Sequence, residues 1–256
     1  MDDLRRDSFS AGGRKGRDRI GRRKYLWLIP LCIAGLVIGL FAVYVSDYYH
    51  ADDTALNALQ SDGSVIVAQT EFGWMFDGPS KRAALIFYPG AKVEETAYAP
   101  FLHRLAEGGI DVFLVKMPFH LAVFGTNRAD RLLSHFSYES WYIGGHLLGG
   151  AMAANYASAH GARLDGVILC AAYPIKSLDS GLTEIMLYGS EDTVLRMNKV
   201  AESRQYAPNH FIERVIPGGN HAQFGNYGLQ AGDGTATISS EEQQEQAADV
   251  ILNEIG

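Results

Sequence analysis

The sequence predicts an α/β protein with a mainly parallel sheet, helices on both faces of that sheet, and one transmembrane helix before it. Three observations indicate this architecture. Apolar segments of strand length recur between residues 65 and 219, amphipathic segments of helical length separate them, and residues 25–45 contain no charge. Strands that are apolar throughout are typical of parallel sheets that helices cover on both faces.

The N-terminal region predicts a membrane anchor. Residues 1–24 carry a net charge of +5, so the rest of the chain carries −12. The segment 25–45 is long enough to cross about 30 Å of hydrocarbon as a helix, and Tyr25, Trp27 and Tyr44 suit the two membrane interfaces. We expect a basic cytoplasmic tail at 1–24, an anchor that contacts membrane lipid at 25–45, and an extracytoplasmic remainder at the cell membrane.

Two alternatives remain for this region. A cleaved signal peptide would have a shorter apolar segment and a better cleavage site than AVYVSD. The basic tail could bind RNA, but its position beside the anchor favours membrane topology and anionic lipid as the explanation. The acidic remainder has no basic face, so we expect no nucleic-acid partner.

The elements after the anchor follow in order. Residues 46–63 are polar with a short helical pattern at 52–60 and predict a stalk, and residues 64–256 are the right length for one α/β domain. Within that domain the strands are expected at 65–70, 73–76, 83–90, 110–116, 141–145, 164–172, 183–189 and 210–219. The helices are expected at 95–109, 127–136, 147–161, 194–207 and 239–255.

The stretch GGHLLGG at 144–150 predicts a tight turn from a strand into a helix. Gly145 and Gly149 stand on either side of His146, Leu147 and Leu148, in the pattern Gly-x-apex-x-Gly of a nucleophile elbow. The apex is Leu147, where such a turn places its nucleophile. A glycine-rich turn can also serve packing alone.

Two later strands end in residues that fit the same site. Asp192 follows the strand at 183–189, and His221 lies in the glycine-rich loop after the strand at 210–219. The order apex, acid, histidine is that of the α/β-hydrolases. His221 would act as general base and acid, and Asp192 would fix its tautomer. Alternatively, Asp192 caps the following helix and His221 is a solvated loop residue.

The oxyanion donors are expected from two backbone amides. Gly90 allows the N–H of Ala91 to face the site, and the N–H of Leu148 directly follows the apex. The histidines form no close ligand pattern such as HExxH, so the sequence predicts neither a metal nor a cofactor. Cys32 and Cys170 are interpreted as packing residues.

Several longer stretches carry a family resemblance: FYPGAKVEETAYAPFLHRLAEGGIDVFLVKMPFHLAVFG, WYIGGHLLGGAMAANYA, AAYPIKSLDS, YGSEDTVL and GGNHAQFGNYGLQAGDGTATISSEEQQEQ. Together they resemble a bacterial α/β-hydrolase family related to dienelactone-hydrolase-like enzymes, whose members often carry an N-terminal membrane segment. The resemblance spans about residues 64–254. The family's elbow reads GGHSLGG, so its serine position falls on Leu147, and its acid and histidine fall on Asp192 and His221.

The resemblance implies a membrane-anchored hydrolase of small carboxylic esters or acyl compounds that is impaired as written, because leucine offers no nucleophilic atom. A non-catalytic surface protein that binds a small ligand or a protein partner through the same pocket is the alternative. Three origins of Leu147 fit: a natural pseudoenzyme, a recently inactivated or altered copy, or a slow hydrolase in which His221 and Asp192 activate water directly. The intact acid and histidine favour the second.

Overall fold

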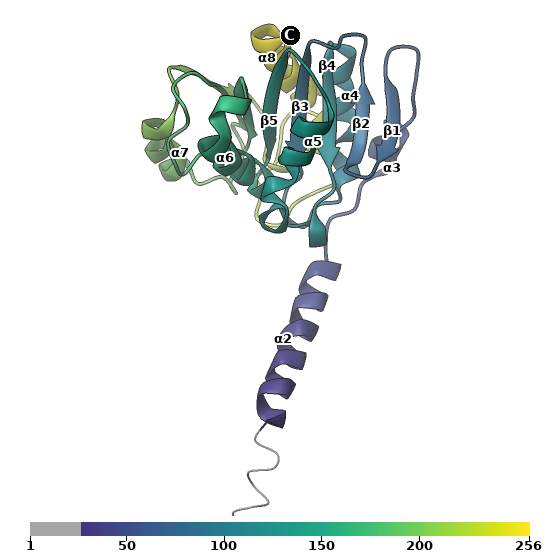
Figure 1. The fold of residues 1–256 in the computed structure, drawn as a ribbon, viewed down its shortest axis with the longest axis vertical. Helices are drawn as coiled ribbons and strands as arrows, with labels where there is room; N and C mark the ends of the chain where they lie inside the picture. Colours follow the sequence, from purple (N-terminus) through teal and green to yellow (C-terminus); the bar gives the residue numbers. More distant parts are fainter. Residues whose placement is uncertain (1–26) are drawn as a thin grey trace, which may run out of the picture. The chain divides into compact units, whose positions relative to one another are not determined.

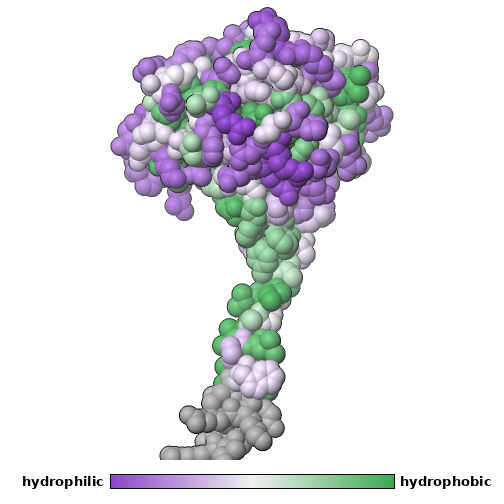
Figure 2. All heavy atoms as spheres, viewed as in Figure 1, coloured by the Kyte–Doolittle hydropathy of each residue, from purple (hydrophilic) through white to green (hydrophobic). Residues whose placement is uncertain are grey.

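The computed structural model describes residues 27–256. These fall into two units, the helix α2 (Leu28–Ser46) and the domain Asp47–Gly256, and each is described by itself. The expected basic tail at 1–24 and Tyr25 at the start of the expected anchor lie outside the described residues. α2 has 19 residues, none of them charged or buried, and is long and apolar enough to cross a membrane. Apolar side chains dominate its surface in Figure 2.

The domain contains a mixed, mostly parallel sheet, which confirms the predicted fold class (Figure 1). The described residues form eight strands in the order β1-β2-β4-β3-β5-β6-β7-β8. Their bounds are β1 (Ile66–Thr70), β2 (Gly73–Asp77), β3 (Ala83–Tyr88), β4 (Ile110–Val115), β5 (Ser140–His146), β6 (Gly166–Cys170), β7 (Thr183–Gly189) and β8 (His210–Ile216). β2 pairs antiparallel with both β1 and β4, and the strands from β4 through β3 to β8 are parallel.

Helices cover both faces of this sheet, as the apolar strands require. One buried cluster joins the sheet to α4 (Ala99–Glu107) and α8 (Ser240–Ile255). A second cluster joins the opposite face to α5 (Ala129–His135) and α6 (Leu148–His160), and a smaller one on that face includes α7 (Met197–Ser203). The buried strands β3, β4, β6 and β7 therefore lie between two helical layers.

The residues expected to form a stalk pack into the domain instead. Tyr49 forms a parallel bridge with Val93, in which the Tyr49 amide donates to Lys92 O and the Glu94 amide donates to Tyr49 O, both at 2.8 Å. The short helix α3 (Asp53–Asn57) follows, capped by Asp52, and buries Ala55 completely. The polar composition of this segment concealed its pairing, because backbone hydrogen bonds leave no mark on a residue pattern.

Two helices are shorter than expected, each for a local reason. The helix expected at 95–109 begins as a 3-10 turn, η1 (Glu95–Tyr98), and continues as α4 with Pro100 in its first turn, where proline's missing N–H costs nothing. The helix expected at 194–207 starts only at Met197, because Asp192 Oδ1 accepts from the amides of Val194 and Leu195 and forms a turn there.

Glu184 on β7 is a buried acid with both carboxyl oxygens unpartnered, opposite Val167 and Phe211. Burial, and then the charge of Glu213, raise its pKa to about 8. Between its ordinary pKa and that value the folded state binds the extra proton, so stability falls as pH rises from about 4.5 to 8. We expect Glu184→Gln to raise the free energy of unfolding at pH 8.5 by a few kcal/mol, an order-of-magnitude figure, and to leave it nearly unchanged at pH 5.

Urea denaturation of the unit Asp47–Gly256 at both pH values measures this effect. The matched control is Glu139→Gln, which removes an acid that is 74% exposed and paired with Arg82, which is 82% exposed. That control is expected to change stability by less than about 0.5 kcal/mol at either pH. An equal gain for Glu184→Gln at pH 5 and pH 8.5 would show that Glu184 is not held protonated by its surroundings.

Candidate active site

The turn between β5 and α6 has Leu147 at its apex, in a backbone conformation that leucine rarely adopts. Its φ is 51° and its ψ is −119°, a region that costs a non-glycine residue about 1–3 kcal/mol. The Leu147 amide donates to Cys170 O at 3.1 Å, and its carbonyl accepts from Ala151 N at 3.0 Å. The main chain is thus held in a strained strand-to-helix turn of the kind that displays a catalytic side chain.

The glycines around the apex are required by close backbone contacts. A Cβ at Gly149 would lie 2.2 Å from Tyr88 O and 2.3 Å from Pro89 O, and a Cβ at Gly145 would lie 2.4 Å from Tyr88 O. A Cβ at Gly150 would lie 2.5 Å from the Cβ of Ala172. These small residues let α6 start directly against β3, which fixes the height of the apex above the sheet.

Asp192 and His221 meet, as their order along the chain predicts. They follow β7 and β8, which end at the same edge of the sheet as β5, and His221 Nδ1 donates to Asp192 Oδ2 at 2.8 Å. Both side chains are fully buried. With Nδ1 bound to the acid, Nε2 is the free nitrogen, and it has no hydrogen-bond partner within the described residues. The alternative of a solvated His221 does not fit its burial, whereas Asp192 forms a turn as well as the pair.

His146, expected only as part of the elbow, also contacts the loop that carries His221. Tyr98 Oη donates to His146 Nδ1 at 2.8 Å, and His146 Nε2 donates to the carbonyl of His221 at 3.1 Å. The two imidazole rings lie 4.7 Å apart. Burial, and then the neighbouring His221, lower the pKa of His146 well below its ordinary value, so it stays neutral and keeps this hydrogen-bond pattern. The loop of His221 is thereby held against His146, the residue that directly precedes the apex.

The two expected oxyanion donors lie in the loop after β3 and at the start of α6. Ala91 lies between Gly90, whose amide donates to Tyr98 Oη at 3.0 Å, and Lys92, whose amide donates to His120 O at 2.9 Å. A Cβ at Gly90 would lie 2.7 Å from Tyr98 Oη, so the loop needs glycine there. Leu148 is the first residue of α6, where an amide has no acceptor within its own helix.

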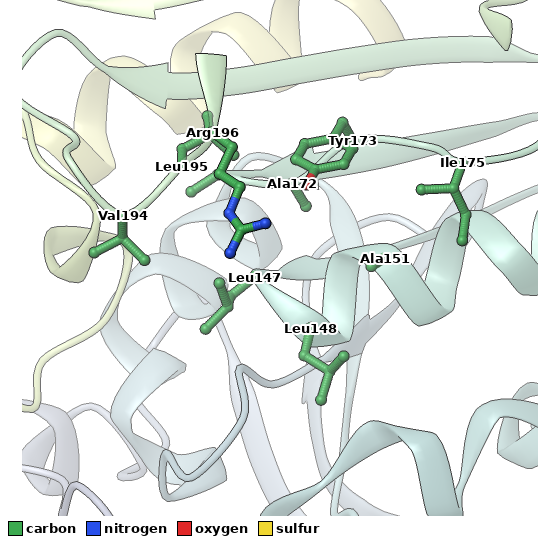
Figure 3. Close-up of a pocket in the computed structure, with 10 residues that line it drawn as sticks. Leu147, Leu148, Ala151, Ala172, Tyr173, Ile175, Val194, Leu195 and Arg196 are labelled. Atoms are coloured by element: carbon green, nitrogen blue, oxygen red, sulfur yellow. The ribbon is translucent and has the colours of Figure 1, made fainter. Parts of the chain in front are cut away.

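A pocket of about 300 Å³ opens beside the apex (Figure 3). Leu147 and Leu148 form part of its wall, but His221, Asp192 and Ala91 do not. The remaining lining residues are mostly apolar and come from α6 and from the segments after β6 and β7: Ala151, Ala171, Ala172, Tyr173, Ile175, Val194, Leu195 and Arg196. Leu147 is therefore the apex residue that lines the pocket, and the buried His221–Asp192 pair is not part of its lining.

Several residues of the site could not be recognised in the sequence. Asp233 accepts from the amides of His221 and Ala222 through its two oxygens, and Gln243 on α8 binds both the amide and the carbonyl of Asn220. Gln243 shares a helix face with the buried Ala247 and Ile251, so a polar residue at an apolar position was its signal. Asp233 and Arg196 had no such signal in the sequence.

A further group of side chains could hold a cation, well away from the elbow in the sequence and on other elements. Asp62, His103 and Glu107 offer ligand atoms within 4.8 Å of one another. Hydrogen bonds from the amides of Ser64 and Val65 lower the pKa of Asp62 to about 2, so a local turn accounts for its carboxylate without a metal.

Comparisons with known proteins agree with this geometry. A sequence model described as the alpha/beta hydrolase family matches residues 84–245. The chain therefore belongs to the α/β hydrolase family. No curated protein sequence matches it.

Solved structures with the same fold include hydrolases and esterases. A protein described as a predicted CIB-like hydrolase from Thermoplasma acidophilum has a TM-score of 0.56 and 13% identity, covering 75% of this chain and 99% of its own. Esterase 2 from Thermogutta terrifontis, phosphoramylated by tabun, has a TM-score of 0.53 and 12% identity over 77% of this chain and 97% of its own. Naproxen esterase from Bacillus subtilis has a TM-score of 0.53 and 10% identity over 80% and 95%. At these identities the shared property is the fold.

Proposed function

We propose that this chain is a membrane-anchored, extracytoplasmic hydrolase of the serine carboxylic-ester or acyl type, related to dienelactone-hydrolase-like enzymes and blocked at its nucleophile position, Leu147. One observation carries the proposal. The His221–Asp192 pair is formed, with Nε2 unpartnered, and His221 contacts His146, the residue directly before the strained apex Leu147. The esterases among the structural neighbours support an ester as the substrate class.

The chemistry that this arrangement would perform needs a hydroxyl at position 147. His221 Nε2 would take the hydroxyl proton as the oxygen attacks the ester carbonyl, and Asp192 would stabilise the resulting imidazolium. The amides of Ala91 and Leu148 would donate to the oxyanion that forms. Leucine has no atom to attack the carbonyl and no proton to give, so no acyl-enzyme forms.

A second function, non-catalytic ligand binding, is favoured by one observation. The pocket remains open at about 300 Å³, with the Leu147 side chain as part of its apolar wall. A pseudohydrolase with this pocket would bind a small ligand or a partner at the cell surface without turning it over.

Replacement of Leu147 by serine tests the catalytic assignment. Fluorophosphonate labelling and activated-ester turnover are expected in the Leu147→Ser protein and not in the protein as written. A folded Leu147→Ser protein that shows neither would remove Asp192 and His221 from a catalytic role.

The membrane anchor has its own test. α2 is uncharged over 19 residues, whereas a cleaved signal sequence would be absent from the mature protein. We expect the full chain to stay in the membrane fraction after alkaline carbonate washing, at its full 28.0 kDa, and a chain that starts at Asp47 to be soluble. External protease on spheroplasts should digest the domain. A shortened, soluble product of the full chain would instead identify α2 as a cleaved signal.

A further inference from the structure

We infer that the pocket beside Leu147 binds a small amphiphilic carboxylate, with its anionic group on Arg196 and its apolar body against the pocket wall. The inference rests on the proposed function only in treating this pocket as the ligand site of the domain. It assigns the ligand's charge to a residue outside the elbow, the histidine pair and the oxyanion donors.

Arg196 is positioned as a recognition group. Its backbone is fixed at the start of α7, where its carbonyl accepts from Lys199 N at 2.8 Å and from Val200 N at 3.0 Å. In Figure 3 its guanidinium extends into the pocket toward Leu147. The side chain forms no salt bridge within residues 27–256.

The acids near Arg196 in the sequence each have another hydrogen-bond or ionic partner. Asp192 is bound to His221 and to two backbone amides, and Glu191 accepts from Ser190 Oγ at 2.9 Å. Glu202 pairs with Lys199 at 2.6 Å, and Glu213 pairs with Arg204 at 2.8 Å. A guanidinium directed into an apolar pocket, with its neighbouring carboxylates engaged elsewhere, is a site for an anion supplied by a ligand.

The rest of the pocket defines the ligand's body and charge. Apart from Arg196 and Tyr173, the lining residues are leucine, isoleucine, valine and alanine, so the ligand must be mainly aliphatic. The positive end of α6 also faces the pocket at Leu148, but among the described residues that line the pocket Arg196 is the one full cation. A single cation matches a monoanionic carboxylate better than a phosphate dianion.

Calorimetry on the full chain in lipid nanodiscs, with empty nanodiscs as the blank, tests this inference. The probes are hexanoate, hexan-1-ol and hexylammonium, which share one apolar body and differ in charge. We expect hexanoate to bind at least about tenfold more tightly than hexan-1-ol, and hexylammonium to show no binding. Arg196→Gln should weaken hexanoate about tenfold and leave hexan-1-ol unchanged, and Arg196→Lys should recover part of the loss.

Two control variants make the result specific. Arg214→Gln removes the same charge from an exposed arginine outside the pocket and should leave hexanoate binding unchanged. Ala151→Phe fills the pocket from α6 and should weaken both hexanoate and hexan-1-ol. Equal binding of hexanoate and hexan-1-ol, or hexanoate binding that survives Arg196→Gln, would overturn the inference, since the carboxylate would then lie elsewhere, for example on the oxyanion amides.

The outcome separates this inference from the proposed function. Charge-selective binding that depends on Arg196, together with an inactive Leu147→Ser protein, would support the inference and contradict the catalytic assignment. An active Leu147→Ser protein whose hexanoate binding is unchanged by Arg196→Gln would support the catalytic assignment and contradict the inference.

Discussion

Leu147→Ser is expected to give the protein the activated-ester hydrolysis that the proposed function assigns to a serine at this position. In serine hydrolases of another fold, loss of the nucleophile costs about 10⁶ in turnover, and the His221–Asp192 pair and the strained turn are already formed here. We expect turnover of a p-nitrophenyl ester to rise by about 10³-fold or more over the protein as written. Stoichiometric fluorophosphonate labelling at residue 147, located by peptide mass spectrometry, should accompany the gain.

Two matched variants identify the source of that activity. Leu147→Ala opens the same space without a nucleophile and should stay unlabelled. Leu147→Ser combined with His221→Ala keeps the hydroxyl but removes the base, so its turnover should fall back by several orders of magnitude. Labelling that persists in the double variant would mean that His221 does not activate residue 147.

Gly149→Ala is expected to destabilise the domain by about 2–3 kcal/mol, despite alanine's higher helix propensity. The new Cβ would lie 2.2 Å from Tyr88 O and 2.3 Å from Pro89 O, and both are backbone atoms of a buried strand end that cannot move cheaply. For a domain of this size the loss corresponds to a fall of about 5–10 °C in Tm, which differential scanning calorimetry of the unit Asp47–Gly256 would measure.

The sign of the change decides the interpretation. Gly63→Ala is the control, because a Cβ at Gly63 meets nothing within 4 Å, and it should change stability by no more than about 0.5 kcal/mol. A gain in stability for Gly149→Ala would mean that the contact between α6 and the end of β3 is loose, and the elbow would lose its structural basis.

The sequence was sufficient for the sheet and for the convergence of distant loops. Apolar strands and glycine-rich loops carry their own signals, so β5, β7 and β8, with the residues that follow them, could be predicted from pattern alone. The environment of His221 could not, because Tyr98, His146 and Asp233 act through hydrogen bonds between residues far apart in the chain. The position of Arg196 could not be predicted from the sequence either. It lies just before α7, and the start of α7 depends on Asp192, whose Oδ1 forms a turn while its Oδ2 binds the His221 imidazole.

The pairing of Tyr49 with Lys92 and Glu94 has a consequence for how the domain can be separated from α2. These hydrogen bonds hold residues 92–94, which directly follow Ala91. The chain just after α2 therefore supports the loop that carries one of the two amides assigned to the oxyanion. A protein that begins at Asp47 keeps both hydrogen bonds of Tyr49. A protein that begins after Tyr49 lacks these hydrogen bonds. Its domain would keep the core and the His221–Asp192 pair, but the loop that contains Ala91 would be held less rigidly.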